Sequence, residues 1–259
     1  MGARLEWALL NYFIDCHIAD GYEFILPPHM LEYQCGETAG QFPKFADEST
    51  RLRIPPTTAS TICCPPRKRS VLHLPGRNSH RSRAAPEVLR LHSLLPPGSR
   101  FRPRRRAGHG ARPPVNKVEM FQFTRPEDSD AAFEELVRKA ENLVKGLGFH
   151  FRTVKLAAGD CSASMARTYD IEIQIPSMNG YKEVSSVSNA RDYQARRGNI
   201  RFRREATGKP EFVHTLNGSG LATSRIFPAM VEQNQRADGS VVSGSLRKYL
   251  GGIEVIEKK

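Results

Sequence analysis

Residues 215–222 constrain the fold of this chain more than any other stretch, because they place small residues between apolar ones. The segment reads Thr-Leu-Asn-Gly-Ser-Gly-Leu-Ala, and Arg225 follows the second glycine by five residues. Glycines let a backbone approach a ligand closely. An arginine on a following helix reaches a phosphate with a planar, permanently charged group. The pattern predicts a tight turn before a core helix at 221–234. By itself it does not distinguish a structural turn from a phosphate site.

The net charge of +12 comes from one block of the chain. Residues 51–115 hold 14 of the arginines, one lysine and a single acid, Glu87, whereas the other 194 residues hold 24 basic and 26 acidic side chains. Eleven of the 18 prolines also lie in this block. Such a segment has little apolar surface to offset the entropy of ordering, so we expect a disordered arginine- and proline-rich arm. The basicity therefore belongs to an insert and not to the fold.

The cysteines and the hydropathy indicate a cytoplasmic chain. The five cysteines are odd in number and lack the C-x-x-C spacing, which favours reduced thiols over a disulfide framework or a zinc site. No apolar run reaches the roughly 18 residues that span a bilayer, and residues 1–6 do not begin a signal peptide. We expect no membrane partner.

Hydrophobic periodicity predicts regular structure on both sides of the basic block. Apolar residues at helical spacing from Leu5 to Cys16 predict a helix that ends at Gly21, followed by a strand at 22–26. After the block, strands are expected at 116–124, 151–157, 169–175, 181–186 and 212–216, with helices at 126–146, ending at Gly146, and at 221–234. Strands joined by hairpins with helices on one side predict an α+β antiparallel sheet. The expected divisions are 1–48, 49–115 and 116–259.

Four blocks of the second half, taken together, resemble the seryl-tRNA synthetases, a class II family. They are Glu-Val-Ser-Ser-Val-Ser-Asn at 183–189, Asp-Tyr-Gln-Ala-Arg-Arg at 192–197, Lys-Pro-Glu-Phe-Val-His at 209–214, and the glycine segment with Arg225. The glycine segment resembles motif 3, which holds ATP in that family. The helix, strand and prolines of residues 5–28 resemble motif 1, which forms the family's homodimer interface. The resemblance implies a class II antiparallel sheet flanked by helices.

The resemblance also implies roles for individual residues. Glu119, Asn217 and Ser219 match the residues that bind the substrate L-serine. Glu183 and Ser186 match ligands of Mg²⁺ and ATP, and Val184 and Ser185 lie between them along the nucleotide. Arg225 matches the catalytic arginine that meets the γ-phosphate. The alternative for the carboxylates and hydroxyls is an ordinary solvated strand face.

The implied activity is the ATP-dependent activation of serine and its transfer to tRNA(Ser). The serine carboxylate that attacks the α-phosphate is already ionised, so the protein supplies positioning and charge neutralisation by arginines and Mg²⁺. Carboxylates, hydroxyls and arginines are therefore the residue types to expect, and a catalytic triad is not.

The chain departs from the family in two places. From the resemblance, we expect residue 1 to lie inside the catalytic domain, after the family's N-terminal helical arm that grips tRNA. Motif 2 is also absent, because no Phe-Arg-x-Glu precedes Asn116. In the next reading frame, permitted codons for residues 94–99 give Cys-Phe-Arg-Arg-Glu, which resembles motif 2. Our hypothesis is that residues 49–115 are a frame-displaced translation of an ordinary synthetase gene.

Three functional interpretations remain open. The first is a serine–tRNA ligase catalytic domain whose activity is impaired in the chain as written. The second is a synthetase-like protein without catalysis that binds RNA through the basic block around residues 104–106. That block carries one aromatic residue, Phe101, and so offers little surface for base stacking. The third is an inert fragment that has lost two central strands and exposes sheet edges.

Overall fold

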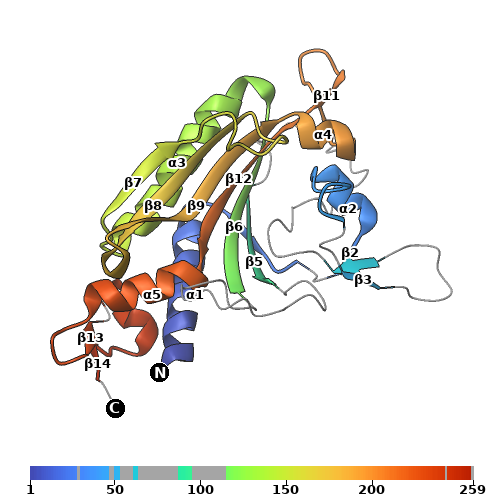
Figure 1. Ribbon diagram of the computed structural model, residues 1–259. Coiled ribbons are helices and arrows are strands. Elements are labelled where there is room, and N and C mark those ends of the chain that lie inside the picture. Colours follow the sequence, from blue (N-terminus) through green and yellow to red (C-terminus); the bar gives the residue numbers. More distant parts are fainter. Residues whose placement is uncertain are drawn as a thin grey trace.

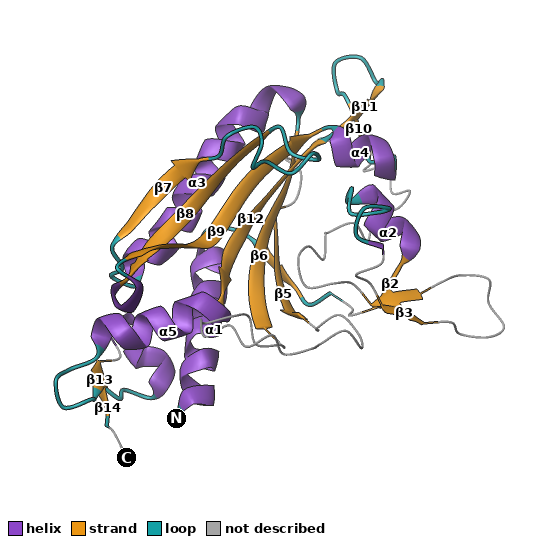
Figure 2. Ribbon diagram, viewed as in Figure 1, coloured by secondary structure: helices purple, strands orange, loops and turns teal. Residues whose placement is uncertain are grey.

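The computed structural model describes residues 1–27, 30–46, 50–52, 61–63, 87–94, 115–242 and 244–257. A seven-stranded sheet dominates the structure (Figures 1 and 2). Among the described strands of this sheet, β1 and β5 pair in parallel and all other neighbours pair antiparallel. The strands, in spatial order, are β1 (Glu23–Ile25), β5 (Glu87–Leu94), β6 (Val115–Thr124), β12 (His214–Ala222), β9 (Gly180–Arg191), β8 (Arg167–Ile175) and β7 (Phe151–Lys155). The predicted α+β antiparallel class is confirmed.

Helices α1 (Gly2–Ala19), α3 (Ser129–Gly146) and α5 (Thr223–Asn234) pack on one face of the sheet, here called the helix face. Two short helices, α2 (Tyr33–Thr38) and α4 (Tyr193–Gly198), pack on each other beyond the start of β12 (Figure 1). The remaining elements are the 3-10 turns η2 (Pro126–Asp128), η3 (Pro176–Met178) and η4 (Gly244–Leu250), and the small strands β2 (Met30–Glu32), β3 (Thr50–Leu52), β4 (Thr61–Cys63), β10 (Arg201–Arg203), β11 (Pro210–Phe212), β13 (Val241–Val242) and β14 (Val255–Ile256). Within the described ranges, no helix is long and apolar enough to cross a membrane.

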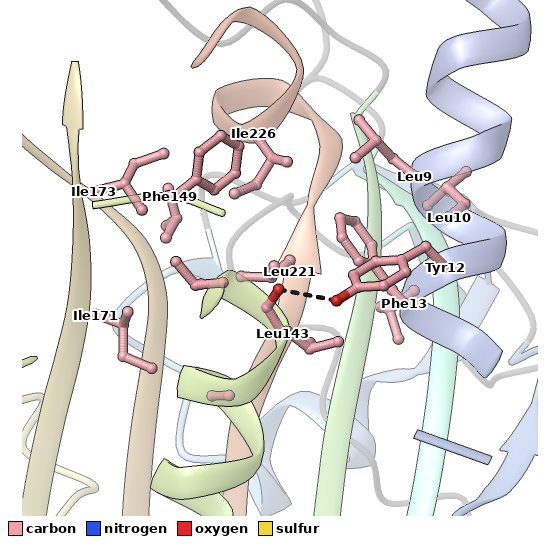
Figure 3. Close-up of a cluster of buried hydrophobic side chains, with 14 of the residues drawn as sticks. Leu9, Leu10, Tyr12, Phe13, Leu143, Phe149, Ile171, Ile173, Leu221 and Ile226 are labelled. Carbon is pink, nitrogen blue, oxygen red and sulfur yellow. Dashed lines mark hydrogen bonds between the residues drawn. The ribbon is translucent and has the colours of Figure 1, made fainter. Parts of the chain in front are cut away.

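The main core lies between the helix face and the three longer helices (Figure 3). The helical spacing of apolar residues in the sequence accounts for the contribution of α1 to this core, because Leu9 and Phe13 are one helical turn apart and both are fully buried. Alternate residues of β8, Ile171 and Ile173, enter the same core from the sheet. The Tyr12 hydroxyl donates a hydrogen bond of 3.2 Å to the Leu143 carbonyl oxygen, so α1 and α3 are joined at the end of α3.

The glycine segment is a central strand and not a turn, which corrects the prediction from sequence. Residues 215–222 belong to β12, which pairs with β6 on one side and β9 on the other. Its glycines face the helices. A Cβ on Gly220 would lie 2.6 Å from Nε2 of His17 on α1, and a Cβ on Gly218 would lie 3.2 to 3.4 Å from Met120, Val187 and Leu136. The two glycines thus permit close packing of the sheet on the helices, and their Cα atoms do not face a ligand.

Several element boundaries also differ from those predicted. The helix predicted to stop at Gly146 includes that residue, and the left-handed glycine that ends it is Gly148, with φ +79°. The strand predicted at 212–216 is two strands, β11 and β12, and the closing helix begins at Thr223. The strand predicted at 181–186 continues to Arg191.

The basic block contains strands that the sequence did not reveal. β3, β4 and β5 all lie within it or at its edge. β5 pairs with β6 over eight residues, from Glu87↔Gln122 to Leu94↔Val115, so β6 is not an exposed edge. The expectation that the neighbouring strands become edges is therefore wrong for β6. Phe101, residues 95–99 and residues 104–106 lie outside the described part of the chain.

Replacing Gly220 with alanine tests the close approach of β12 to α1. The new methyl group would overlap the imidazole of His17 and crowd Val118 at 3.2 Å, in a site with 0% exposure at His17. We expect Gly220→Ala to lower the free energy of unfolding by about 1–3 kcal/mol, as overpacking does. Gly159→Ala is the matched control, because nothing lies within 4 Å of its Cβ position. Equal stability of the two variants in urea titrations would contradict the packing argument.

The buried His17 predicts a loss of stability in acid. Burial lowers the pKa of His17 from 6.5 to about 4. In this pH range the unfolded chain therefore binds a proton at His17 that the folded chain does not bind, and stability is lost as the pH falls from 6.5 toward 4. Between pH 7.5 and pH 5 the free energy of unfolding falls by about 2 kcal/mol. Urea unfolding of the wild type and of His17→Gln at both pH values measures it. The free energy of unfolding of the variant should change less between the two pH values. An equal change in both proteins would contradict the role of His17.

Candidate active site

A polar group lies on the face of the sheet opposite the helices, here called the open face. Glu119 on β6 is directly opposite Ser219 on β12. The Asn217 side-chain amide donates to Glu119 Oε1 at 3.0 Å, and the Lys117 ammonium forms an ion pair with the same carboxylate. Because Val118 and Met120 point into the core, strand alternation places Glu119 on the open face. This places the three predicted serine-binding residues together, with Glu119 only 8% exposed.

A second group, rich in carboxylates, lies on β9, which pairs with β12, and on the next strand, β8. Ser186 is directly opposite Asp170, and Glu183 is directly opposite Glu172. A register shift between Ile171 and Glu172 accounts for the extra residue of β9 in this stretch. Glu183 is 45% exposed at its side chain, so its carboxylate is accessible from the open face.

Arg225 reaches this group from the first turn of α5. Its guanidinium donates to the Glu183 carbonyl oxygen and lies 3.4 Å from the Glu183 carboxylate. The end of β12 sets this approach, because the register shifts between Ser219 and Ala222 and Leu221 adopts a left-handed φ of +82°. A buried, non-glycine residue with positive φ marks strain held by its surroundings, as occurs at functional sites. No side chain in the described part of the protein caps the N-terminus of α5, so its first backbone N–H groups are of the kind that bind an anion.

Val184 and Ser185 face the other way. The Val184 side chain belongs to the main core, and Ser185 is 1% exposed. The Ser185 hydroxyl donates to the Ser219 carbonyl oxygen at 2.8 Å, where the backbone pairing of β9 with β12 has already ended at Gly218. These two residues therefore offer only their backbone to a nucleotide, and Ser185 ties the two polar groups together across adjacent strands.

The charges of the second group are set by burial and by its neighbours. Burial raises the pKa of Asp170, the Ser186 hydroxyl lowers it by hydrogen bonding, and the carboxylates of Glu183 and Glu172 raise it. Asp170 Oδ1 is buried and has no hydrogen-bond partner among the residues that the structure describes. An added cation would relieve both effects, because it favours ionised carboxylates.

The residues fit a Mg²⁺ ion that is bound partly by the protein and partly by a phosphate. Mg²⁺ takes oxygen ligands, uses one or two carboxylates and completes its shell with water and substrate phosphates. The Glu183 carboxylate and the Ser186 hydroxyl are such donors, and the orphaned Asp170 oxygen lies beside Ser186. Among the described residues, no group of three or more His, Cys, Asp or Glu forms a complete metal cage.

Sequence reasoning missed two supports of the site. Lys117 pairs with Glu119, and its position two residues earlier on the same strand was an available signal. Glu6 on α1 accepts hydrogen bonds from Asn116 at 3.1 Å and from Thr223 at 2.9 Å. That contact joins the start of β6 to the first turn of α5 over more than a hundred residues, so no local pattern could reveal it.

Comparison with known proteins agrees with this geometry. The family model for the tRNA synthetase class II core domain (G, H, P, S and T) matches residues 101–234. A curated serine–tRNA ligase 2 of Clostridium acetobutylicum is 57% identical over 261 residues, which cover 96% of this chain and 60% of that protein. A serine–tRNA ligase of Magnetococcus marinus is 43% identical over 99% of this chain and 59% of its own length.

Solved structures match the whole chain. The seryl-tRNA synthetase of Pyrococcus horikoshii, complexed with ATP, superposes with a TM-score of 0.80 at 29% identity, over 100% of this chain and 57% of that one. The cytoplasmic serine–tRNA ligase of Naegleria fowleri, in complex with AMP, has a TM-score of 0.85 at 26% identity and is covered to 60%. This chain belongs to the class II tRNA synthetase core-domain family. It spans about 60% of the length of the curated relatives it matches.

Proposed function

We propose that the open face activates serine with ATP for transfer to tRNA(Ser). One observation carries the proposal: the Glu119–Asn217–Ser219 group on β6 and β12 lies beside Glu183 and Ser186 on the neighbouring strand β9, and Arg225 reaches Glu183 from α5. In this account the first group binds L-serine, with the Glu119 carboxylate on the substrate ammonium. Ser219 and Asn217 hydrogen-bond the serine hydroxyl, so a substrate that lacks the hydroxyl leaves buried polar groups unpaired.

The second group binds ATP. Arg225 neutralises the γ-phosphate, and the backbone of Val184 and Ser185 runs along the nucleotide. Glu183 and Ser186 would hold Mg²⁺, which supplies charge neutralisation to the phosphates when bound. The serine carboxylate is the nucleophile and needs no base, so the work of the protein residues is to align the carboxylate with the α-phosphate.

Binding of a stable adenylate analogue tests the serine group without requiring turnover. We expect Glu119→Gln to weaken seryl-sulfamoyl adenosine by roughly 10- to 100-fold, because a charge-assisted hydrogen bond contributes about 1.5–3 kcal/mol. Affinity for AMP should stay within about threefold. Calorimetric titration of both ligands measures this, with Glu135→Gln on α3 as a control that removes a carboxylate elsewhere. Unchanged affinity for the seryl analogue, or an equal loss for AMP, would overturn the assignment.

We propose in addition that catalysis is severely impaired in the chain as written. The support is the absence of a motif 2 sequence before Asn116, since that motif supplies the α-phosphate arginine in the family. Serine-dependent exchange of pyrophosphate into ATP near the rate of a full-length relative would refute it. The frame-displacement hypothesis for 49–115 has a separate test, the coding DNA. One or two displaced bases that restore a Phe-Arg-Arg-Glu would support it, and a clean reading frame would refute it.

A homodimer formed through residues 5–28 is also part of the proposal. Two apolar side chains on one face of α1, Trp7 and Ile18, are exposed, as are Phe24 and Leu26 on the neighbouring edge strand and its exit. Exposed aromatic and aliphatic groups on one surface are typical of a protein interface.

The single tryptophan makes the dimer measurable. We expect sedimentation at twice the 29.0 kDa chain mass, with the Trp7 emission shifting to longer wavelength on dilution. Trp7→Ala should weaken association by about 30-fold, the effect of losing about 2 kcal/mol at a central aromatic contact. Met178→Ala, which removes an exposed apolar side chain elsewhere, is the control. A wild-type chain that stays monomeric at all concentrations would contradict this part of the proposal.

The division of the chain into 1–48, 49–115 and 116–259 and a cytoplasmic location stay predictions. Cys16, Cys35 and Cys161 are free thiols, which supports a reducing compartment. The RNA-binding alternative becomes the leading account if neither serine nor nucleotide binds to the open face.

A further inference from the structure

A small hairpin beside the site carries an unusual concentration of positive charge. It is formed by β10 and β11, which pair antiparallel and project beyond α4 (Figure 1). The stretch 191–212, which includes α4 and this hairpin, contains seven basic and three acidic side chains. The arginines that follow the Asp-Tyr-Gln-Ala-Arg-Arg block have no role in the proposed serine and ATP sites.

The hairpin is firmly fixed to the sheet. Arg204 donates to both oxygens of Glu127, at 2.8 and 3.1 Å, and to both oxygens of Glu211, at 2.7 and 2.6 Å. Such bidentate pairs fix orientation as well as distance. Phe202 and Phe212 pack against a cluster that includes Phe121 and Phe123 of β6. Those two residues alternate with the core residues of β6, so the hairpin is attached to the open face.

Other arginines on the hairpin keep their charge for a ligand. Arg201 and Arg203 lie on one side of β10, about 6.6 Å apart along the strand. Arg201 donates to Asn199 and lies over the Phe212 ring at 4.2 Å, and Arg203 donates to the Gly208 carbonyl oxygen. Neither has a carboxylate partner among the described residues. Their neutral partners orient the guanidinium groups without cancelling their charge.

Arg197 on α4 extends this surface. It donates to the carbonyl oxygens of Glu37 and Phe42 and is exposed. α4 is itself held in place by Gln194, which donates to the Ala39 carbonyl and accepts from the Thr215 hydroxyl. Arg197, Arg201 and Arg203 are therefore three oriented cations on a rigid support, here called the arginine surface.

The arginine surface and the serine group are joined by one strand. β12 leaves the hairpin at His214 and reaches Ser219 five residues later, a span of about 17 Å. A single ligand that contacts both groups would be extended, and anionic where it meets the arginines. The phosphate backbone of an RNA strand has both properties, because it repeats its charge along its length.

We propose that the arginine surface binds the phosphate backbone of the tRNA substrate next to its single-stranded 3′ end, which then runs along the open face to the serine group. This inference rests on the proposed function and names the protein surface that guides the acceptor strand. Arginine forks match phosphate geometry, and the binding is electrostatic and independent of base sequence.

The test measures how tRNA(Ser) binding depends on salt for two matched double variants of the full chain. One is Arg201→Ala with Arg203→Ala. The control is Arg138→Ala with Arg247→Ala, which removes the same charge from the exposed side of α3 and from η4. The arginines of residues 51–115 are present in every variant, so the difference isolates the hairpin. Fluorescence anisotropy of labelled tRNA(Ser) between low and moderate salt gives the dissociation constant and its salt slope.

We expect the hairpin variant to bind about 5- to 10-fold more weakly and its salt slope to flatten by roughly 1.4 to 1.8, the loss of two phosphate contacts on a single or a double strand. Arg201→Lys with Arg203→Lys should restore most of the slope, because the charge is retained. Equal affinities and slopes for the hairpin and control variants would overturn the proposal, as would a wild-type chain that binds no tRNA. The affinity of the variants for seryl-sulfamoyl adenosine should equal that of the wild type. If the wild type does not bind this compound, the serine site is refuted independently of the RNA data.

Discussion

The close packing of β12 on α1 and α3 is the constraint on which the open face depends. Gly218 and Gly220 leave no side chain on the helix face, so Met120, Val187, Leu136 and His17 fill the space. Because side chains alternate along a strand, the residues that alternate with the two glycines, Asn217 and Ser219, must then point to the other face. The glycines therefore act indirectly, since they bring the sheet onto its core and present two polar side chains to the open face.

The strain at the end of β12 completes the arrangement. The register shift after Ser219 and the left-handed Leu221 turn the chain from the sheet into α5 within four residues. Arg225 thereby reaches Glu183, and Thr223 reaches Glu6 on α1. One segment of about ten residues thus contributes to the serine group, the nucleotide group and the contact with the N-terminal helix. Residues 215–225 therefore indicated the site in the sequence, although they form a strand where the sequence predicted a turn.

The sequence predicted elements with a regular period and missed contacts made at a distance. α1 and α3 were found from their apolar faces, and β8 from strict alternation around Ile171 and Ile173. The turn predicted at Gly218 failed because small residues were taken as a sign of flexibility, whereas here they serve a close approach of sheet and helix. β5 was missed because it lies inside the arginine- and proline-rich block, which was read as disordered as a whole. The β10–β11 hairpin was missed because its strands have only three residues each. The site residues themselves came from the family resemblance, and the fold brings them together.

The most direct measurement of the central claim is the discrimination between seryl- and alanyl-sulfamoyl adenosine by the wild-type chain. If Asn217 and Ser219 line a serine pocket beside Glu119, the alanyl compound leaves their polar groups without a partner. A site that hydrogen-bonds a substrate hydroxyl rejects the analogue that lacks it by up to ~10⁴-fold. The account predicts a preference for the seryl compound approaching that range, measured by competition calorimetry. Equal affinities for the two compounds would contradict it.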